Sequence, residues 1–162
     1  MHYRLANEAD ILQLVNMRLN YLAEDYGGLT DEQTSAIRAQ LREYFTKHLN
    51  RDLSVYVCED QAEIVATVFL LITEKPANPA FITGLTGTIL NVYTLPHYRN
   101  RGIAGNLMRM AVSDAESKNL SYLELYATKA GYNLYRKLGF VPFEPKNTYM
   151  RYQINHEKES DN

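Results

Sequence analysis

The apolar residues of the first fifty positions predict a short strand followed by two helices. Residues 3–5 are typical of a strand, and Asn7 can cap a helix that Gly27 and Gly28 end. Thr30 and Gln33 form a capping-box pattern for a second helix. The apolar positions that recur at helical spacing are Ile11, Leu14, Val15, Leu19 and Leu22, then Ile37, Leu41, Tyr44, Phe45 and Leu49.

Strand patterns fill the middle of the chain. Residues 53–58 alternate between apolar and other side chains, and a polar turn at 59–61 leads into the apolar run 64–72. This arrangement predicts a hairpin. A loop containing Pro76 and Pro79 then precedes a further strand over residues 88–94.

The last third of the chain predicts helices and strands in alternation. A helix from Gly102 is followed by a strand at 122–126 and a short helix at 130–138, and strands are predicted at 141–143 and 148–154. One face of the longer helix carries Ile103, Leu107, Met108, Ala111, Val112 and Ala115.

This order of elements predicts a mixed sheet. Three consecutive strands argue against a fully parallel sheet, whereas the later helical crossovers require some parallel pairing. We therefore expect an α/β (α+β) fold with a central mixed β-sheet flanked by helices. We expect one domain over residues 1–154 and a polar, frayed tail over residues 155–162.

Composition excludes several classes of function. With 46% apolar and 22% charged residues in 162, the chain fits one globular domain with a single core. A net charge of −2 gives no electrostatic reason to expect nucleic acid or an anionic membrane as a partner. The longest apolar run, 64–72, is too short to span a bilayer, and Met1 opens into structured sequence, so we expect a cytoplasmic protein.

The reactive residues give no sign of a metal or redox site. Cys58 is the only cysteine and sits in an alternating strand pattern, so we interpret it as a small packed residue. The four His are scattered, and we expect no metal.

The loop between the strand at 88–94 and the next helix has the features of an anion site. Gly102 and Gly105 allow a ligand to approach the backbone, and the free N–H groups of a helix start favour a phosphate. This helix has no acid before Asp114, whereas Arg99 and Arg101 precede it. A glycine-containing turn with solvated arginines is the alternative interpretation. The loop matches neither G-x-x-x-x-G-K-(S/T) nor G-x-G-x-x-G, which disfavours the simple nucleotide-binding folds.

Two motifs carry a resemblance to a known family. Arg99-x-x-Gly102-x-Ala104 resembles the (Q/R)-x-x-G-x-(G/A) signature of the GNAT superfamily of acyl-CoA-dependent N-acyltransferases, and residues 91–96 resemble that family's core strand and its exit. The segment from Tyr135 to Phe140 resembles the family's Y-x-x-x-G-F motif, about thirty residues downstream as the family requires.

The resemblance implies a cleft that holds an acyl-CoA, most simply acetyl-CoA. In this family the core strand bulges and splays from its parallel neighbour, and pantetheine bonds to main-chain groups in the gap. By the same resemblance Thr128 would contact the pantetheine arm, although the family often has Asn there and Ala at the position of Gly131. The residues that would bind the co-substrate are thus Val92, Tyr93, Thr94, Arg99, Asn100, Arg101, Gly102, Ile103, Ala104, Gly105 and Thr128.

The implied reaction is direct attack of an amine on the thioester. Tyr135 matches the family's thiolate-protonating Tyr, with packing against Leu138 and Phe140 as the alternative role. Glu124 lies on the strand that would form the other cleft wall and is a candidate base acting through water, although an edge-facing solvated carboxylate is at least as good an interpretation. Glu24 and Asp25 are candidates for reading a cationic acceptor.

The resemblance does not identify the acceptor. We expect a small-molecule amine rather than a protein, because the loop around Pro76 and Pro79 offers no acidic trough for a basic tail. A protein N-terminal or lysine acetyltransferase and a non-catalytic acyl-CoA-binding regulatory module remain alternatives. A homodimer is compatible with the tyrosine-rich sequence, although no residue requires one.

Overall fold

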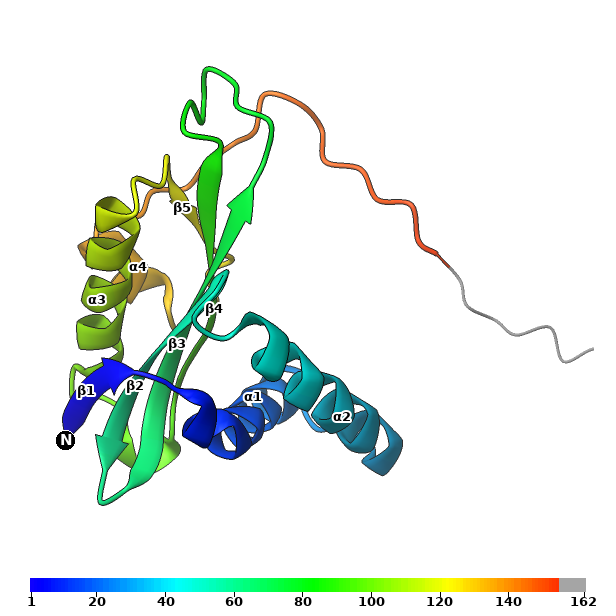
Figure 1. Cartoon of the computed structure of the whole chain (residues 1–162), viewed down its shortest axis with the longest axis vertical. Coiled ribbons are helices and arrows are strands. Elements are labelled where there is room, and N and C mark those ends of the chain that lie inside the picture. The colour runs from blue at the N-terminus through cyan, green and yellow to red at the C-terminus, as the bar shows by residue number, and fades with distance from the viewer. Residues whose placement is uncertain (155–162) are drawn as a thin grey trace, which may run out of the picture.

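The computed structural model describes residues 1–154 and shows a five-stranded mixed sheet with helices on both faces (Figure 1). The strands follow the order β1-β2-β3-β4-β5, and every neighbouring pair is antiparallel except β4 and β5, which are parallel. Their bounds are β1 His2–Leu5, β2 Leu53–Asp60, β3 Glu63–Glu74, β4 Leu85–Thr94 and β5 Leu123–Glu124. The predicted mixed sheet is confirmed.

The helices begin where the capping patterns predict. Thr30 Oγ1 accepts from the Gln33 amide at 3.1 Å and the Gln33 side chain accepts from the Thr30 amide at 3.0 Å, which satisfies two N–H groups at the helix start. A 3-10 turn, Glu8–Asp10, leads into the first helix. The bounds are α1 Ile11–Asp25, α2 Asp31–His48, α3 Ile103–Ser117 and α4 Tyr132–Lys137.

The sheet separates two apolar cores. Because successive strand residues point to opposite faces, β2 gives Val55 and Val57 to the core under α1 and α2, and Tyr56 and Cys58 to the core under α3 and α4. Cys58 is fully buried there, which confirms its interpretation as a packed residue. Both faces of the central strands are therefore covered, and the functional surface must lie at an edge or a gap of the sheet.

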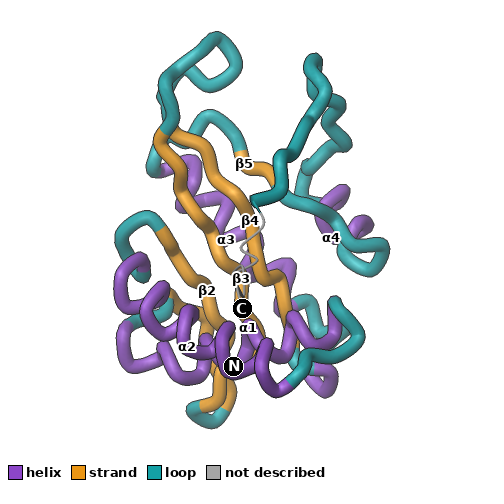
Figure 2. The backbone as a smooth tube through the Cα atoms, turned by 90° about the vertical axis from the view of Figure 1, so that its right-hand side faces the viewer, coloured by secondary structure: helices purple, strands orange, loops and turns teal. Residues whose placement is uncertain are grey.

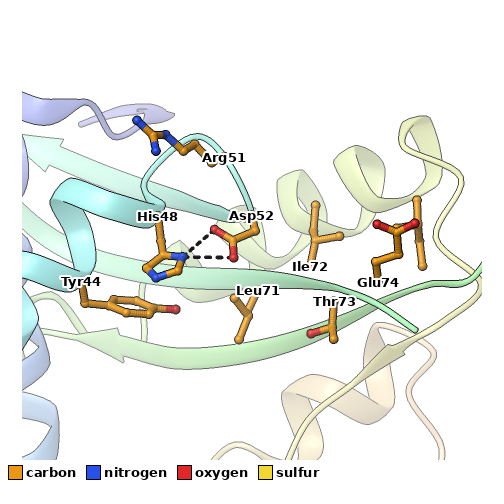
Figure 3. A pocket seen from close by; sticks show the side chains of 9 residues that line it. Tyr44, His48, Arg51, Asp52, Leu71, Ile72, Thr73 and Glu74 are labelled. Atoms are coloured by element: carbon orange, nitrogen blue, oxygen red, sulfur yellow. Dashed lines mark hydrogen bonds and ion pairs between the residues drawn. The ribbon is translucent and has the colours of Figure 1, made fainter. Parts of the chain in front are cut away.

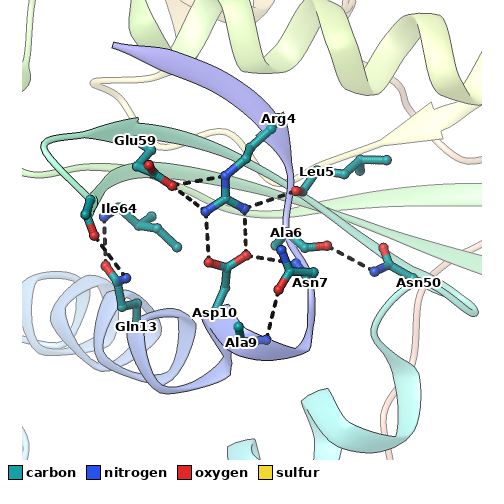
Figure 4. Close-up of polar contacts among 11 residues, drawn as sticks. Arg4, Leu5, Ala6, Asn7, Ala9, Asp10, Gln13, Asn50, Glu59 and Ile64 are labelled. Atoms are coloured by element: carbon teal, nitrogen blue, oxygen red, sulfur yellow. Dashed lines mark hydrogen bonds and ion pairs between the residues drawn. The ribbon is translucent and has the colours of Figure 1, made fainter.

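The β1 edge of the sheet is held by a compact ion network (Figure 4). Arg4 donates to both carboxylate oxygens of Asp10, at 2.7 and 2.9 Å, and also pairs with Glu59 of β2 at 2.5 Å. Asp10 is buried, and its hydrogen bonds from Arg4 hold the pKa of its carboxyl below the usual range. Asn50 donates to the carbonyl of Ala6 at 3.0 Å, so the chain entering α1 is fixed from both sides.

The two strands predicted at the C-terminal end are wrong for this single chain. Residues 141–143 and 148–154 form no strand and are exposed, and the segment leaves the body of the molecule (Figure 1). Pro142 and Pro145 lack the N–H groups that strand pairing needs, and neither segment pairs with a strand among residues 1–154. The strand predicted at 122–126 is reduced to the two residues of β5. The tail predicted over 155–162 lies outside the described residues.

Candidate active site

A gap opens in the sheet between β4 and β5. The two strands pair only at Gly87 with Leu123 and at Thr88 with Glu124, although β4 continues to Thr94. Figure 2 shows β5 beside one end of β4 only. Beyond Thr88 the main chain of β4 on this side has no strand partner within residues 1–154, so its N–H and C=O groups are available to a ligand.

A β-bulge lies in the unpaired half of β4. Thr67 of β3 faces Tyr93 and Phe69 faces Leu90, so Val68 alone is opposite both Asn91 and Val92. Asn91 has a φ of +50°, a left-handed conformation that asparagine adopts more readily than most residues. The bulge interrupts the pairing with β3 at residues 91 and 92, and the pairing resumes at Tyr93 and Thr94. A bulge in this strand is what the family resemblance implies.

Buried side chains hold this bulge in place. Asn91 Nδ2 donates to Thr67 Oγ1 at 2.8 Å, and Arg18 of α1 donates to Asn91 Oδ1 at 3.3 Å. Asn91 and Thr67 are both buried, so these bonds fix the amide in one orientation. Sequence reasoning gave Asn91 and Arg18 no role. The signal for Asn91 was a single amide side chain between the apolar pairs Ile89–Leu90 and Val92–Tyr93.

The start of α3 is shaped for an anion. Gly102 caps the helix with φ +74°, and a side chain at this φ would be strained. The first intrahelical bond runs from Asn106 N to Gly102 O at 3.1 Å, which leaves the N–H groups of Ile103, Ala104 and Gly105 without helical acceptors. The first turn holds no acid, and nothing lies within 4 Å of a Cβ built at Gly102. Free donors and open space are what a phosphate needs.

The two arginines of the loop hold the turn together. Arg99 donates to the Thr94 carbonyl at 2.9 Å and to Glu24 of α1 at 2.6 Å. Arg101 donates to the His97 carbonyl at 2.8 Å. The bond from Arg99 holds the pKa of Glu24 below its usual range, so Glu24 is engaged by a cation of its own chain. The interpretation of this loop as an anion site therefore depends more on its main-chain N–H donors than on the charges of its two arginines.

Tyr135 lies in α4, and its side chain is buried. Its ring packs edge-on against Phe140, with centroids 6.2 Å apart. Within residues 1–154 no buried side-chain oxygen or nitrogen lacks a partner, and the Tyr135 hydroxyl has no hydrogen bond, so that hydroxyl reaches solvent. Burial, with a smaller effect of Tyr21, raises the pKa of Tyr135 to about 12. The phenol is thus protonated at neutral pH and free to donate.

Gly131 makes room for the Tyr135 ring. A Cβ built on Gly131 would lie 2.7 Å from Cε2 of that ring, closer than atoms can approach. The departure from the family's Ala at this position therefore has a packing reason. The Thr128 hydroxyl accepts a hydrogen bond from the Gly131 amide at 3.2 Å, so it is bonded within its own turn.

Glu124 is exposed on β5 opposite Thr88. The Thr88 hydroxyl lies 3.4 Å from Glu124 Oε1. Thr88 alternates with Ile89, which packs under α3, so Thr88 and Glu124 face the side of the sheet that α1 and α2 cover. A carboxylate is therefore present on the α1 side of the gap.

Arg18 places a cation on that same side. Its guanidinium lies 5.3 Å from the centre of the Tyr21 ring, and Tyr21 packs edge-on against Tyr93. Burial lowers the pKa of Arg18, and none of the ion pairs formed among residues 1–154 involves it. A half-buried cation without a carboxylate partner is costly unless an anion offsets it.

A separate hollow lies between α2 and the outer part of β3 (Figure 3). Its volume is about 550 Å³, and its lining includes Tyr44, His48, Asp52 and residues 71–74. His48 Nδ1 lies 2.8 Å from Asp52 Oδ1. None of the residues predicted to bind the co-substrate lines it. Across residues 1–154, no helix is long and apolar enough to cross a membrane.

Comparisons with known proteins agree on one family. The sequence model described as "Acetyltransferase (GNAT) domain" matches residues 51–142, more than half of the chain. The structure resembles that of a predicted acetyltransferase with acetyl-CoA from Clostridium acetobutylicum, with a TM-score of 0.81 and 30% identity over 93% of this chain and 95% of the other. None of the curated proteins matches the chain.

More distant structures share the fold. A GCN5-related N-acetyltransferase from Ralstonia eutropha JMP134 is 24% identical, with a TM-score of 0.77 over 92% of this chain and 97% of that one. Glucosamine-6-phosphate N-acetyltransferase from Arabidopsis thaliana is 15% identical, with a TM-score of 0.67 over 93% and 99% of the two chains.

Proposed function

The chain belongs to the GNAT acetyltransferase family, and from this premise we propose that it transfers acetyl from acetyl-CoA to the amine of a small molecule. The observation that carries the proposal is the continuity of three features. The unpaired, bulged half of β4 leads through residues 95–102 to the free N–H groups of α3, Tyr135 packs in the same core as Ile103 of α3, and the Tyr135 hydroxyl is unbonded.

The donor half of the reaction follows from the main-chain groups. The N–H groups at positions 103–105 would hold the pyrophosphate, because they have no helical acceptor and the helix dipole adds positive potential. The main chain of Val92, Tyr93 and Thr94 would bond to the pantetheine in place of a missing strand. Gly102 leaves the approach to these donors open.

The chemical step is a direct attack within a ternary complex. The neutral amine forms a bond to the thioester carbon, the C–S bond breaks, and the amine's proton must leave while the thiolate takes one up. Tyr135 supplies the second proton, because its phenol stays protonated at neutral pH and its hydroxyl has no competing partner. Glu124 is our candidate for receiving the first proton through water, since it is exposed on the α1 side of the gap.

The acceptor would enter from the α1 side, where Arg18 and Tyr21 face the bulge. Arg18 favours an acceptor that carries a carboxylate or phosphate near its amine, because that anion would offset the half-buried guanidinium. The hydroxyl-bearing rings of Tyr21 and Tyr93 suit a compact polar molecule. These features support a small-molecule acceptor over a protein acceptor.

A matched acceptor panel tests the proposal. Thiol release from acetyl-CoA would be followed with amino acids, with their amides, with amino-sugar phosphates and with peptides that offer an N-terminus or a lysine. We expect turnover with a small amine and a kcat/KM at least tenfold higher for the member that carries the anion. Turnover confined to peptides would contradict the small-molecule proposal. Acetyl-CoA binding without turnover on any amine would indicate the non-catalytic module.

A further inference from the structure

The hollow between α2 and the outer part of β3 has the size and the lining of a ligand site. Its volume of about 550 Å³ is within the range of sites that hold a small molecule. β3 contributes Leu71 and Thr73 to the lining, and α2 contributes Tyr44 and His48 (Figure 3). The hollow therefore combines apolar surface with a few polar groups, as ligand sites do.

The imidazole of His48 is held in one position. Its Nδ1 donates to the carboxylate of Asp52, with distances of 2.8 and 3.1 Å to the two oxygens, and its ring packs against the Tyr44 ring with centroids 4.5 Å apart. The Asp52 carbonyl accepts from the Ile72 amide at 2.7 Å, which fixes the partner as well. His48 Nε2 has no hydrogen bond, and no buried nitrogen or oxygen among residues 1–154 lacks a partner. In the neutral ring this nitrogen is thus an accessible acceptor.

The charges around the hollow favour a hydrogen-bond donor over an anion. Asp52 and Glu74 bring two carboxylates to the lining, and Arg51 brings one cation. A carboxylate or phosphate in the hollow would meet a net negative charge, whereas a hydroxyl would meet an acceptor at His48 Nε2.

Tyr44 lies between the hollow and the side of the sheet where the acceptor would enter. Burial raises the pKa of its phenol, the charge of Asp52 adds to that increase, and the charge of Arg18 opposes it. Both charged groups therefore lie close to the phenol. Arg18 in turn donates to Asn91 Oδ1, in the bulge of β4, at 3.3 Å. Tyr44 thus connects the hollow with the guanidinium beside the bulge.

The register of the sheet gives a second connection and a distance. Leu71 packs against the core under α1 and α2 and faces Thr88 of β4, whose hydroxyl lies 3.4 Å from Glu124 Oε1. Thr88 precedes Asn91 by three positions, which is about 10 Å along an extended strand. The hollow therefore begins about 10 Å from the bulge, on the face of the sheet that α1 and α2 cover.

We propose that this hollow holds the far end of the acceptor, and that the acceptor is an elongated amine with an apolar chain that ends in a hydrogen-bond donor such as a hydroxyl. The proposal rests on the proposed function, which puts the amine beside the bulge and its anion on Arg18. The apolar chain packs along Tyr44 and Leu71, and the terminal hydroxyl donates to His48 Nε2.

Acceptors that share one head group and differ in length test the proposal. Thiol release from acetyl-CoA would be followed with alanine, 2-aminooctanoate and 2-amino-8-hydroxyoctanoate, which carry the same amine and carboxylate. We expect kcat/KM to rise about tenfold from alanine to 2-aminooctanoate, because the longer chain buries apolar surface. The terminal hydroxyl should add about fivefold, because it gains one hydrogen bond.

Variants in the hollow test where these gains arise. Thr73→Trp should fill the hollow and remove the gain with chain length. His48→Phe keeps a ring against Tyr44 and should remove only the gain from the hydroxyl. Lys47→Gln, at an exposed position of α2, is the matched control and should keep both gains. Each gain is a ratio of two acceptors within one protein, so a smaller folded fraction does not change it.

Amide chemical shifts give a readout that does not need turnover. With coenzyme A bound, 2-amino-8-hydroxyoctanoate should shift the amides of Tyr44, His48 and Thr73, and alanine should not. An absence of turnover on every amine would contradict the proposed function, and these shifts would then decide the hollow by themselves. Equal kcat/KM for the three acceptors, a length gain that survives Thr73→Trp, or shifts confined to the bulge would overturn the proposal.

Discussion

The two edges of the sheet differ in how far their strands are paired. At the β1 edge, four residues pair with β2, and Arg4, Asp10 and Glu59 tie β1, the turn before α1 and β2 into one network. At the β5 edge, two residues pair with β4, and the rest of β4 is left unpaired with a bulge in its middle. At the first edge all four residues of β1 pair with the neighbouring strand, whereas at the second most of β4 has no partner on the β5 side.

This difference separates stability from function. The charged side chains at the first edge, Arg4, Asp10 and Glu59, are paired with one another. The second edge keeps the N–H groups at 103–105, the β4 main chain and the Tyr135 hydroxyl unsatisfied by the chain itself. Changes at the β1 edge should therefore lower stability with little effect on the site, and changes around Tyr135 should do the reverse.

The largest effect is expected at the β1 edge. Asp10→Asn removes a buried carboxylate from Arg4 and should lower the free energy of unfolding by about 3 kcal/mol at pH 7. Urea unfolding measures this, with Glu8→Gln, an exposed acid in the same turn, as a control that changes less than about 0.5 kcal/mol. Acetyl-CoA affinity of the folded variant should be unchanged, and a loss of affinity equal to that of a site variant would break the comparison.

The same variant has a defined pH dependence. Arg4 lowers the pKa of Asp10, so the native carboxylate contributes stability above its unfolded pKa of about 3.9, and this contribution is lost as the pH falls further. The difference in unfolding free energy between native protein and Asp10→Asn should therefore shrink below about pH 4. A difference that stays constant from neutral pH to about pH 3 would show that charge is not its source.

The next effect is expected at Tyr135. Tyr135→Phe should lower kcat by about 100-fold with little change in the KM for acetyl-CoA or in stability, because only the proton donor is lost. The control is Tyr132→Phe, on the exposed side of α4. Since the pKa of Tyr135 is about 12, the shape of the pH–rate profile at neutral pH should be the same in Tyr135→Phe as in the native enzyme. Unchanged turnover would remove Tyr135 as the acid.

A smaller effect should come from Gly131→Ala. The added methyl would lie 2.7 Å from the Tyr135 ring, so the ring must move and its hydroxyl with it. We expect kcat to fall about tenfold, since small misplacements of a catalytic group are costly. Lys129→Ala, at an exposed position in the same turn, is the control. Full activity in Gly131→Ala would show that the ring has room to shift without consequence.

Much of the fold was predictable because its signals are local. The capping pair Thr30 and Gln33 and the periodic apolar positions of α1, α2 and α3 identify helices without knowledge of their neighbours. The sequence pattern that predicts an anion site at residues 99–105 is local in the same way. The C-terminal strands failed because a strand pattern does not specify which edge, or which chain, it will join.

The site was less predictable where it depends on distant contacts. Glu24 and Arg99 lie 75 positions apart, so sequence could not show that each engages the other. Arg18 and Asn91 meet through the packing of α1 on β4, and neither belongs to a motif. The role of Gly131 could be recognised only from the position of the Tyr135 ring in the structure.

One measurement tests most directly that the co-substrate binds in the gap beside β4. Amide chemical shifts of the labelled protein, followed as coenzyme A is added, should change most at positions 92–94 and 102–105. Those of His48 and Asp52, in the hollow beside α2, should stay nearly unchanged. Shifts centred on His48 and Asp52, with none at the start of α3, would contradict the donor site proposed here.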